Sequence, residues 1–178
     1  MSAPLETPPV IGFAAWSGTG KTTLLAGLMP LLRAHGLRIG MIKHAHHGFD
    51  IDQPGKDSHI LRKAGAEQVL IASRERWALM VETPAASDDP ALAELLPRLD
   101  CSHLDLILVE GFRHERFPKI ELHRAALGRP LLFPEDDSII ALASDTPIAT
   151  ALPHFTLGDA AGIAAFIMQY CGLTAYRT

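Results

Sequence analysis

Ala15-Trp16-Ser17-Gly18-Thr19-Gly20-Lys21-Thr22 is the most informative stretch of this 178-residue chain. It follows a short apolar run, Val10–Ala14, and opens a helix-like segment, Thr22–His35. A strand that ends in a glycine-rich turn and continues as a helix points successive backbone N–H groups into one concavity, which suits a polyphosphate. The stretch departs from the pattern G-x-x-x-x-G-K-[ST] only at Ala15, which replaces the first glycine. It therefore predicts a phosphate-binding loop.

Individual residues of this loop have predicted tasks. Lys21 can reach the β- and γ-phosphates and assist catalysis, and the Thr22 hydroxyl can hold Mg²⁺. We expect the nucleotide to contact the whole run, which is made up of Trp16, Ser17, Gly18, Thr19, Gly20, Lys21, Thr22 and Thr23. The alternative is a glycine-rich turn that binds nothing, which the strand before it and the helix after it disfavour.

The composition is that of one globular domain. Hydrophobic residues make up 48% and charged residues 20%, and the formal net charge is -4, so no general affinity for nucleic acid or anionic membranes is expected. No stretch reaches the ~20 apolar residues that span a bilayer, and residues 1–9 lack the apolar region of a signal peptide. We expect a cytoplasmic protein with reduced cysteines, a flexible N-terminus at 1–9, a nucleotide-binding domain at 10–172 and a tail at 173–178.

Apolar runs alternate with helix-like segments, which predicts an α/β fold: a P-loop NTPase whose mostly parallel sheet has helices on both faces. Besides the segments named above, strands are predicted at Arg38–Lys43, Gln68–Ala72, Trp77–Glu82, Leu104–Val109, Lys119–His123 and Ile139–Ala143, and helices at Ser58–Ala64, Ala91–Leu99 and Ala160–Tyr170. Trp77–Glu82 and Lys119–His123 do not fit the alternation. They are predicted to form an antiparallel ribbon or ordinary sheet edges.

An acid stands at the carboxyl end of the most apolar strand, Leu104–Val109. Ligands of parallel α/β sheets bind just outside such strand ends. Glu110 is therefore predicted to help hold Mg²⁺ through a water, or to orient an attacking water, and Gly111 to let the backbone approach the γ-phosphate. Asp105 lies at the other end of the strand, and we expect it to be structural.

A second acid, Asp145, follows the strand Ile139–Ala143. A carboxylate can accept hydrogen bonds from both N1–H and the N2 amine of guanine, whereas adenine has an acceptor at N1 and no N2 amine. Asp145 is therefore a candidate guanine reader, with Ala143 and Ser144 supplying backbone donors to the guanine O6. The alternative, left open here, is that Asp145 caps the Asp-Thr-Pro turn that it begins.

The polar segment Lys43–Ser58 follows the second strand and mixes cations with acids. Lys43 is a predicted phosphate contact. Asp57 is a predicted Mg²⁺ ligand and also the predicted N-cap of the next helix. Two alternatives stay open: a solvated histidine-rich loop, or a transition-metal site built from His44, His46, His47, Asp50 and Asp52.

Together these motifs resemble the molybdopterin-guanine dinucleotide biosynthesis protein B (MobB) family. The resemblance covers nearly the whole chain, roughly Ile11 to Phe166. The matching pieces occur in order and are Trp16–Thr23, Ile42–His47, Asp52–Ser58, Arg62–Ala66, Arg76–Met80, Leu104–Phe112 and Ala143–Asp145. The resemblance implies a homodimeric GTP-binding protein with weak GTPase activity, which supports the enzyme that joins GMP to molybdopterin. Some members of the wider class carry a lysine that acts across a dimer where this chain has Trp16.

The expected function is therefore a GTP-binding adapter in molybdopterin guanine dinucleotide (molybdenum cofactor) biosynthesis. Its expected ligands are GTP and Mg²⁺, and its expected partners are the guanylyltransferase and molybdenum cofactor proteins. No glutamine or arginine finger stands out in the sequence, which fits slow hydrolysis. The alternatives are a metallochaperone-type GTPase with a histidine-rich loop, a small-molecule kinase on the same scaffold, and a scaffold that needs no nucleotide.

Overall fold

The computed structural model describes residues 7–45, 48–83 and 89–174, which form two compact units. The larger unit comprises Met1–His44 and Ala91–Thr178, and the smaller unit comprises Ala45–Pro90. The domain predicted at 10–172 is divided between the two units, and its outer bounds stay a prediction. Among the described residues, no helix has the length and apolar character needed to cross a membrane.

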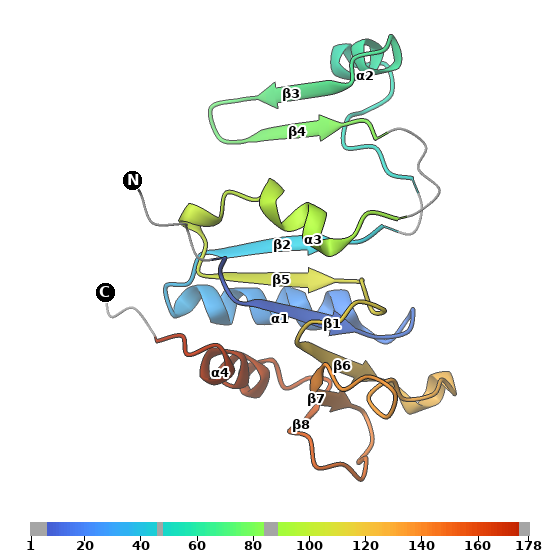
Figure 1. The fold of residues 1–178 in the computed structure, drawn as a ribbon, viewed down its shortest axis with the longest axis vertical. Helices are drawn as coiled ribbons and strands as arrows, with labels where there is room; N and C mark the ends of the chain where they lie inside the picture. The colour runs from blue at the N-terminus through green and yellow to red at the C-terminus, as the bar shows by residue number, and fades with distance from the viewer. Residues whose placement is uncertain (1–6, 46–47, 84–88, 175–178) are drawn as a thin grey trace. The chain divides into compact units, whose positions relative to one another are not determined.

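A six-stranded parallel sheet forms the centre of the larger unit (Figure 1). In spatial order its strands are β2 (Ile39–Lys43), β5 (Leu106–Glu110), β1 (Val10–Ala14), β6 (Lys119–His123), β7 (Ile139–Ser144) and β8 (His154–Thr156). The first five correspond to predicted strands. β8 has no predicted counterpart because three residues are too few to display a strand period.

Two helices cover one face of this sheet. α1 (Lys21–Ala34) and α4 (Ala160–Tyr170) pack on β1, β5, β6 and β7 in one apolar core, to which the helices contribute Leu24, Leu25, Leu28, Leu32, Ile163, Ala164 and Ile167. Each fully buried leucine or isoleucine contributes about 1.5–3 kcal/mol relative to an exposed one. Pro30 lies on the exposed side of α1, which continues through it to Ala34.

The opposite face is apolar over β2 and β5. There α3 (Leu92–Leu95) and the 3₁₀ turn η1 (Leu96–Arg98) pack their leucines on Ile42, Ile107 and Val109. The predicted helix Ala91–Leu99 is shorter than expected because Pro97 lacks the N–H group that an α-helix would use. Further 3₁₀ turns follow at η2 (Cys101–His103) and η3 (Ala125–Leu127). Helices on both faces are thus confirmed.

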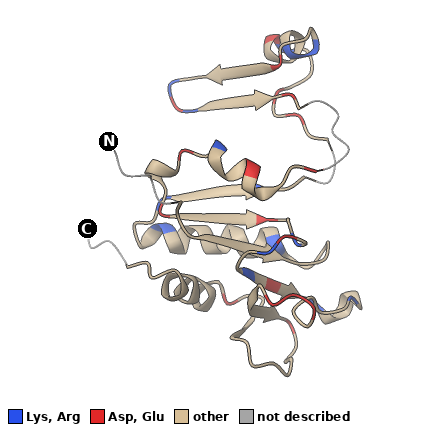
Figure 2. Cartoon of the chain, in the orientation of Figure 1, with Lys and Arg blue, Asp and Glu red and all other residues tan. Residues whose placement is uncertain are grey.

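The prediction that Lys119–His123 is a sheet edge or part of an antiparallel ribbon is wrong. β6 lies inside the sheet and runs parallel to both neighbours, β1 and β7. The sequence is misleading because it places Lys119 and Glu121 in this strand, and charged residues are rare in buried strands. Both residues are nevertheless 0% exposed. Figure 2 shows the resulting basic and acidic segments on β6.

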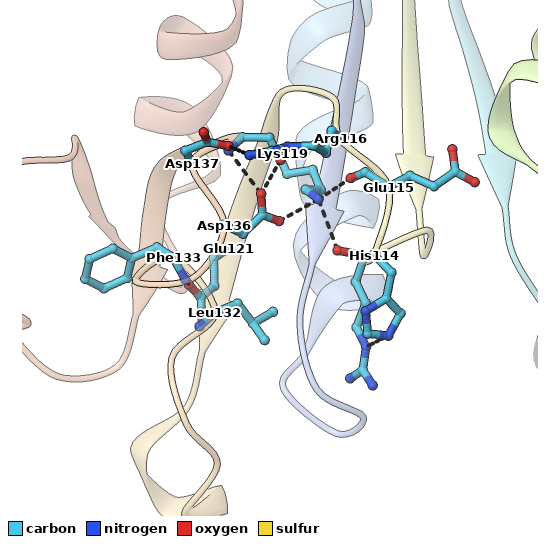
Figure 3. A network of polar contacts seen from close by, with 11 residues as sticks. His114, Glu115, Arg116, Lys119, Glu121, Leu132, Phe133, Asp136 and Asp137 are labelled. Carbon is cyan, nitrogen blue, oxygen red and sulfur yellow. Dashed lines mark hydrogen bonds and ion pairs between the residues drawn. The ribbon is translucent and has the colours of Figure 1, made fainter.

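Polar anchors explain how β6 tolerates these charges (Figure 3). Alternate residues of a strand face the same side, so Lys119 and Glu121 both lie on the face opposite α1 and α4. The Lys119 ammonium lies 2.7 Å from a carboxylate oxygen of Asp136. The Glu121 carboxylate accepts hydrogen bonds from the backbone N–H groups of Leu132 and Phe133. Loops held by polar contacts thus cover β6 on this face.

The smaller unit contains β3 (Gln68–Ala72), β4 (Trp77–Val81) and the helix α2 (Asp57–Lys63), all three predicted as elements. β4 pairs antiparallel with β3, whereas the predicted ribbon combined it with Lys119–His123. The prediction that Asp57 is the N-cap is wrong. The N-cap is Lys56, and Asp57 is the first helical residue. Its negative charge still favours the helix start through the helix dipole.

Arg62 is the polar centre of the smaller unit. Only 7% of its side chain is exposed, and its guanidinium forms ion pairs with Asp50 (2.6 Å), Asp52 (2.7 Å) and Glu82 (2.8 Å). Hydrogen bonds from Arg62 lower the pKa of Asp52, and those to Asp52, Glu82 and Asp50 raise the pKa of Arg62. One arginine on α2 therefore ties the helix to the 50–52 segment and to the end of β4.

Candidate functional site

The loop at residues 15–22 forms the turn between β1 and α1. Gly18 and Gly20 have φ values of 81° and 107°, which favour glycine. Thr19 is buried, and its hydroxyl donates to the carbonyl of Trp16 at 2.7 Å. Gly20 is the N-cap of α1 and offers no side-chain cap. The N–H groups of residues 21–23 at the first turn are therefore available to an anion.

Lys21 folds back onto this loop. Its ammonium donates to the carbonyls of Ala15 at 3.1 Å and Trp16 at 3.4 Å. The pKa of Lys21 is lowered, first because the side chain is half-buried; the carboxylate of Glu110 opposes this shift, and the charges of Arg113 and Lys43 add to it. The charged side chains of Glu110, Arg113 and Lys43 are therefore close enough to the P-loop lysine to influence it. Ser17, Thr22 and Thr23 are exposed beside it.

Glu110 lies at the carboxyl end of β5, where Figure 2 shows an acidic segment. The ammonium of Lys43 lies 3.5 Å from its carboxylate, which is 12% exposed. The backbone carbonyl of Glu110 accepts from the N–H of His44 at 2.8 Å. The ends of β2 and β5 thus bring together two predicted site residues, Lys43 and Glu110. Their roles toward phosphate and Mg²⁺ stay predictions.

Gly111 and Phe112 both adopt positive φ values, 100° and 52°. A Cβ on Gly111 would lie 2.6 Å from the Cβ of His44, the residue that follows β2. Glycine is therefore needed at position 111. Phe112 offsets its backbone strain by burying its ring, whose centroid lies 5.0 Å from that of His44. The close approach seen at Gly111 is to His44, and the predicted approach to a γ-phosphate stays a prediction.

Asp145 follows β7 and faces a segment that the sequence did not suggest. Its carboxylate accepts from the backbone N–H of Ala125 at 2.9 Å and lies 3.9 Å from the guanidinium of Arg124. The hydrogen bond thus goes to the 124–125 segment rather than to the turn that Asp145 begins. Each carboxylate oxygen has two acceptor sites, so capacity for a further donor is left. The guanine-reading role stays a prediction.

Ala143 and Ser144 lie within β7, in register with both β6 and β8. Ala143 is fully buried, and the N–H groups of a strand flanked on both sides point to its neighbours. This placement argues against Ala143 as a donor to guanine. The Ser144 hydroxyl contacts the ring of His154 at 2.6 Å.

A cavity of about 220 Å³ adjoins the P-loop. Its walls come from the loop and α1, from Arg124 and from the start of α4, and its lining residues are Thr19, Gly20, Thr23, Leu24, Gly27, Arg124, Leu157, Gly158 and Ala160. The cavity lies beside the first turn of α1.

The smaller unit holds the remaining predicted residues. Asp57 is exposed at the first turn of α2, and its role as a Mg²⁺ ligand stays a prediction. Asp50 and Asp52, which the metal-site alternative requires, are both paired with Arg62. His46 and His47 lie outside the described residues. Among the residues that the structure does describe, no group of three or more acidic, histidine or cysteine side chains could hold a metal ion.

Three arginines near the P-loop were not predicted from the sequence. Arg124 donates to the carbonyl of Thr19 at 3.3 Å. The guanidinium carbons of Arg113 and Arg129 lie 4.4 and 5.3 Å from the ring centroid of Trp16. Arg124 follows β6 directly. Because β6 was predicted at the edge of the sheet, Arg124 was not expected near the P-loop. A central β6 would have placed Arg124 at the ligand-binding edge of the sheet.

Comparison with known proteins gives the family. The family model described as "Molybdopterin guanine dinucleotide synthesis protein B" (MobB) matches residues 10–145, which include the P-loop, Glu110 and Asp145. The chain belongs to the MobB family.

Curated relatives and solved structures of the MobB family cover nearly the whole chain. It is 52% identical to the molybdopterin-guanine dinucleotide biosynthesis adapter protein of Escherichia coli, over 91% of this chain and 93% of that protein. It is 42% identical to the Haemophilus influenzae protein of the same name, over 91% and 89%. A crystal structure of molybdopterin-guanine biosynthesis protein B superposes with a TM-score of 0.72 at 25% identity, over 92% of this chain and 99% of that chain. The predicted α/β fold is confirmed.

Proposed function

We propose that this protein is a GTP-binding adapter in molybdopterin guanine dinucleotide biosynthesis, with weak GTPase activity at most. The observation that carries the proposal is its 52% identity, over nearly its whole length, to a protein that bears this adapter name. The P-loop supports the nucleotide part. Gly18 and Gly20 shape the turn, and the uncapped N–H groups at the start of α1 suit phosphate oxygens.

The residues around the loop fit GTP and Mg²⁺. Lys21 would leave the loop carbonyls for the β- and γ-phosphates, and the Thr22 hydroxyl and Glu110 would hold Mg²⁺ directly or through its waters. Mg²⁺ would neutralise phosphate charge and orient the terminal phosphate. The cavity beside Thr23 and Arg124 would take part of the nucleoside.

A homodimer in the cytoplasm completes the proposal. The β3–β4 pair exposes large apolar side chains on a two-stranded sheet, namely Leu70, Ile71, Trp77, Leu79 and Val81. A two-stranded hairpin is marginally stable in water by itself, and such exposed apolar side chains are typical of protein interfaces. A second copy of the chain, or the guanylyltransferase, would cover this hairpin.

The metallochaperone alternative is weaker, because Arg62 already occupies two of the carboxylates that it needs, those of Asp50 and Asp52. The small-molecule kinase alternative predicts tight ATP binding and rapid phosphoryl transfer. Comparing the affinities for GTP and ATP therefore separates the kinase from the adapter.

The deciding experiment is affinity capture of the guanylyltransferase by this protein, with and without GTP and Mg²⁺, for wild type and Lys21→Ala. We expect capture by wild type, and we expect Lys21→Ala to fold but to lose nucleotide binding, because the Lys21 ammonium belongs to the loop itself and lies on the carbonyls of Ala15 and Trp16. Wild-type GTP affinity in the folded variant would exclude the P-loop assignment. Absence of capture under every condition would exclude the adapter role.

A further inference from the structure

Trp16, the second residue of the P-loop, holds two arginines from distant segments. Its indole N–H donates to the carbonyl of Pro130 at 2.9 Å, which fixes the ring beside the 129–130 segment. The guanidinium carbons of Arg113 and Arg129 lie 4.4 and 5.3 Å from the ring centroid. Both distances are within the range of cation–π attraction, which is strongest with tryptophan. The Trp16 side chain thus keeps two arginine side chains close to the P-loop.

These cations are in excess over the acids near the loop. Lys43 forms an ion pair with Glu110, and Arg124 forms one with Asp145. Across residues 7–45, 48–83 and 89–174, by contrast, neither Arg113 nor Arg129 forms an ion pair. Both guanidinium groups therefore lie against the same ring of the P-loop without a carboxylate partner among these residues. The region therefore favours a polyanion, and a nucleoside triphosphate is one.

Arg113 is the arginine nearer to the reacting end of the site. It follows Glu110 by three residues, on the loop that leaves the carboxyl end of β5, where ligands of parallel sheets bind. Its charge also reaches Lys21, because it contributes to the lowered pKa of that ammonium. Arg129 comes from the connection between β6 and β7 and lies farther from the ring.

Lys119 fixes the main chain of Arg113. Its ammonium is fully buried and donates to the carbonyl of Arg113 at 3.0 Å and to that of Glu115 (Figure 3). Its third partner is Asp136, at 2.7 Å. Gly12 on β1 makes room for this side chain, since a Cβ there would lie 2.7 Å from Cγ of Lys119. The loop that carries Arg113 is therefore anchored in the sheet.

We propose that Arg113, stacked on Trp16, contacts the terminal phosphate of a nucleoside triphosphate in the P-loop, and that Lys119 is its positioning residue. This inference rests on the proposed nucleotide binding. It assigns to this chain a cis-acting arginine. Planar guanidinium groups bind phosphate oxygens in pairs, and such charge-assisted bonds are among the strongest in proteins. GDP lacks the phosphate concerned, so the contact discriminates GTP from GDP.

The test measures GTP and GDP affinity with Mg²⁺ for wild type, Arg113→Ala, Arg113→Lys and Arg129→Ala. Arg113→Ala should lose about ten- to a hundred-fold in GTP affinity and leave GDP affinity nearly unchanged. Arg113→Lys should recover part of the loss. Arg129→Ala, the matched control on the same ring, should change both affinities by the same factor. Equal GTP-to-GDP ratios in wild type and Arg113→Ala would overturn the proposal, even if Lys21→Ala abolishes binding as expected.

The positioning role is tested with Lys119→Met, which keeps the length of the side chain. We expect the GTP-selective loss of Arg113→Ala to recur in this variant, whereas a general structural defect would lower GTP and GDP affinity together. If the single variant does not fold, Lys119→Met combined with Asp136→Asn removes the unpaired carboxylate and allows the same comparison. A wild-type affinity ratio in either folded variant would overturn the role of Lys119.

Discussion

Asp145 is the residue on which base choice depends in the proposed function. Its carboxylate accepts from Ala125 N–H at one oxygen and has further acceptor capacity. We predict that Asp145→Asn weakens GTP binding and favours xanthosine triphosphate, because asparagine pairs one donor with the carbonyl that xanthine has in place of the N2 amine. Loss of a charged hydrogen-bond pair should cost roughly 1.5–3 kcal/mol, about ten- to a hundred-fold in affinity. Equilibrium titration with both nucleotides measures it.

The structure supplies the control for this variant. The amide oxygen of asparagine can keep the bond to Ala125 N–H, so the free energy of unfolding should change little, and inorganic pyrophosphate should still bind at the P-loop. If the variant binds GTP as wild type does, Asp145 only fastens the 124–125 segment to β7, and guanine recognition belongs to other residues.

Local pattern can predict which candidate site residues lie near one another when they stand in a loop or at a strand end. The P-loop, Lys43 and Glu110 come together because the carboxyl ends of parallel strands meet at one edge of the sheet. Arg113 and Arg129 could not be predicted in this way. Their common partner, Trp16, is far from both in sequence, and a cation–π contact has no sequence period.

At the scale of elements, β6 shows how a strand can be found and still be misplaced. Its residues, Lys119–His123, are those predicted, but its charged side chains suggested an exposed edge. The partners that make Lys119 and Glu121 tolerable inside lie outside the strand. Asp136 and the 132–133 backbone follow β6 in the chain, and the carbonyls of Arg113 and Glu115 precede it. Alternation along a strand predicts its faces, whereas its neighbours depend on such distant contacts.

The pair between Lys119 and Asp136 gives β6 a pH dependence. Burial alone would raise the pKa of Asp136, but hydrogen bonds from Lys119 and Ser138 hold it below its ordinary value. As the pH falls below about 4, Asp136 is therefore protonated in the unfolded chain before it is protonated in the folded one. The free energy of unfolding decreases until the pH has dropped through the folded-state pKa of Asp136. We predict that Asp136→Asn is less stable than wild type near neutral pH and loses less stability on acidification. Urea unfolding at a series of pH values measures both.

Three other acids, Asp52, Asp100 and Asp105, also have lowered pKa values. The stability of wild type and of the variant therefore falls on acidification for this common reason as well. The informative quantity is therefore the difference between the two curves. It should shrink as the pH falls, because protonated Asp136 no longer forms the ion pair. A difference that stays constant down to low pH would show that this pair does not couple stability to protonation.

At the scale of the whole molecule, the chain combines two units with different sources of stability. The larger unit has an apolar core between its sheet and the helices α1 and α4. The smaller unit leaves much of its β3–β4 pair exposed and is organised around the buried guanidinium of Arg62. The sequence predicted most of the helices and strands of both units, β8 excepted, but not the separation into two units, because apolar runs occur in each unit and only the contact pattern distinguishes them.

We predict that Arg62→Met unfolds the smaller unit and spares the larger one. Methionine fills the space of the side chain stem but leaves Asp52, whose side chain is 1% exposed, buried without its partner. Hydrogen exchange should show lost amide protection in α2, β3 and β4, with protection in β1, β5 and α1 retained. Arg38→Met, which removes the ion pair between a half-exposed arginine and Asp105, is the matched control and should leave both units protected. If protection falls equally in both units, they unfold as one cooperative body. If it falls in neither, the ion pairs of Arg62 do not hold the smaller unit together.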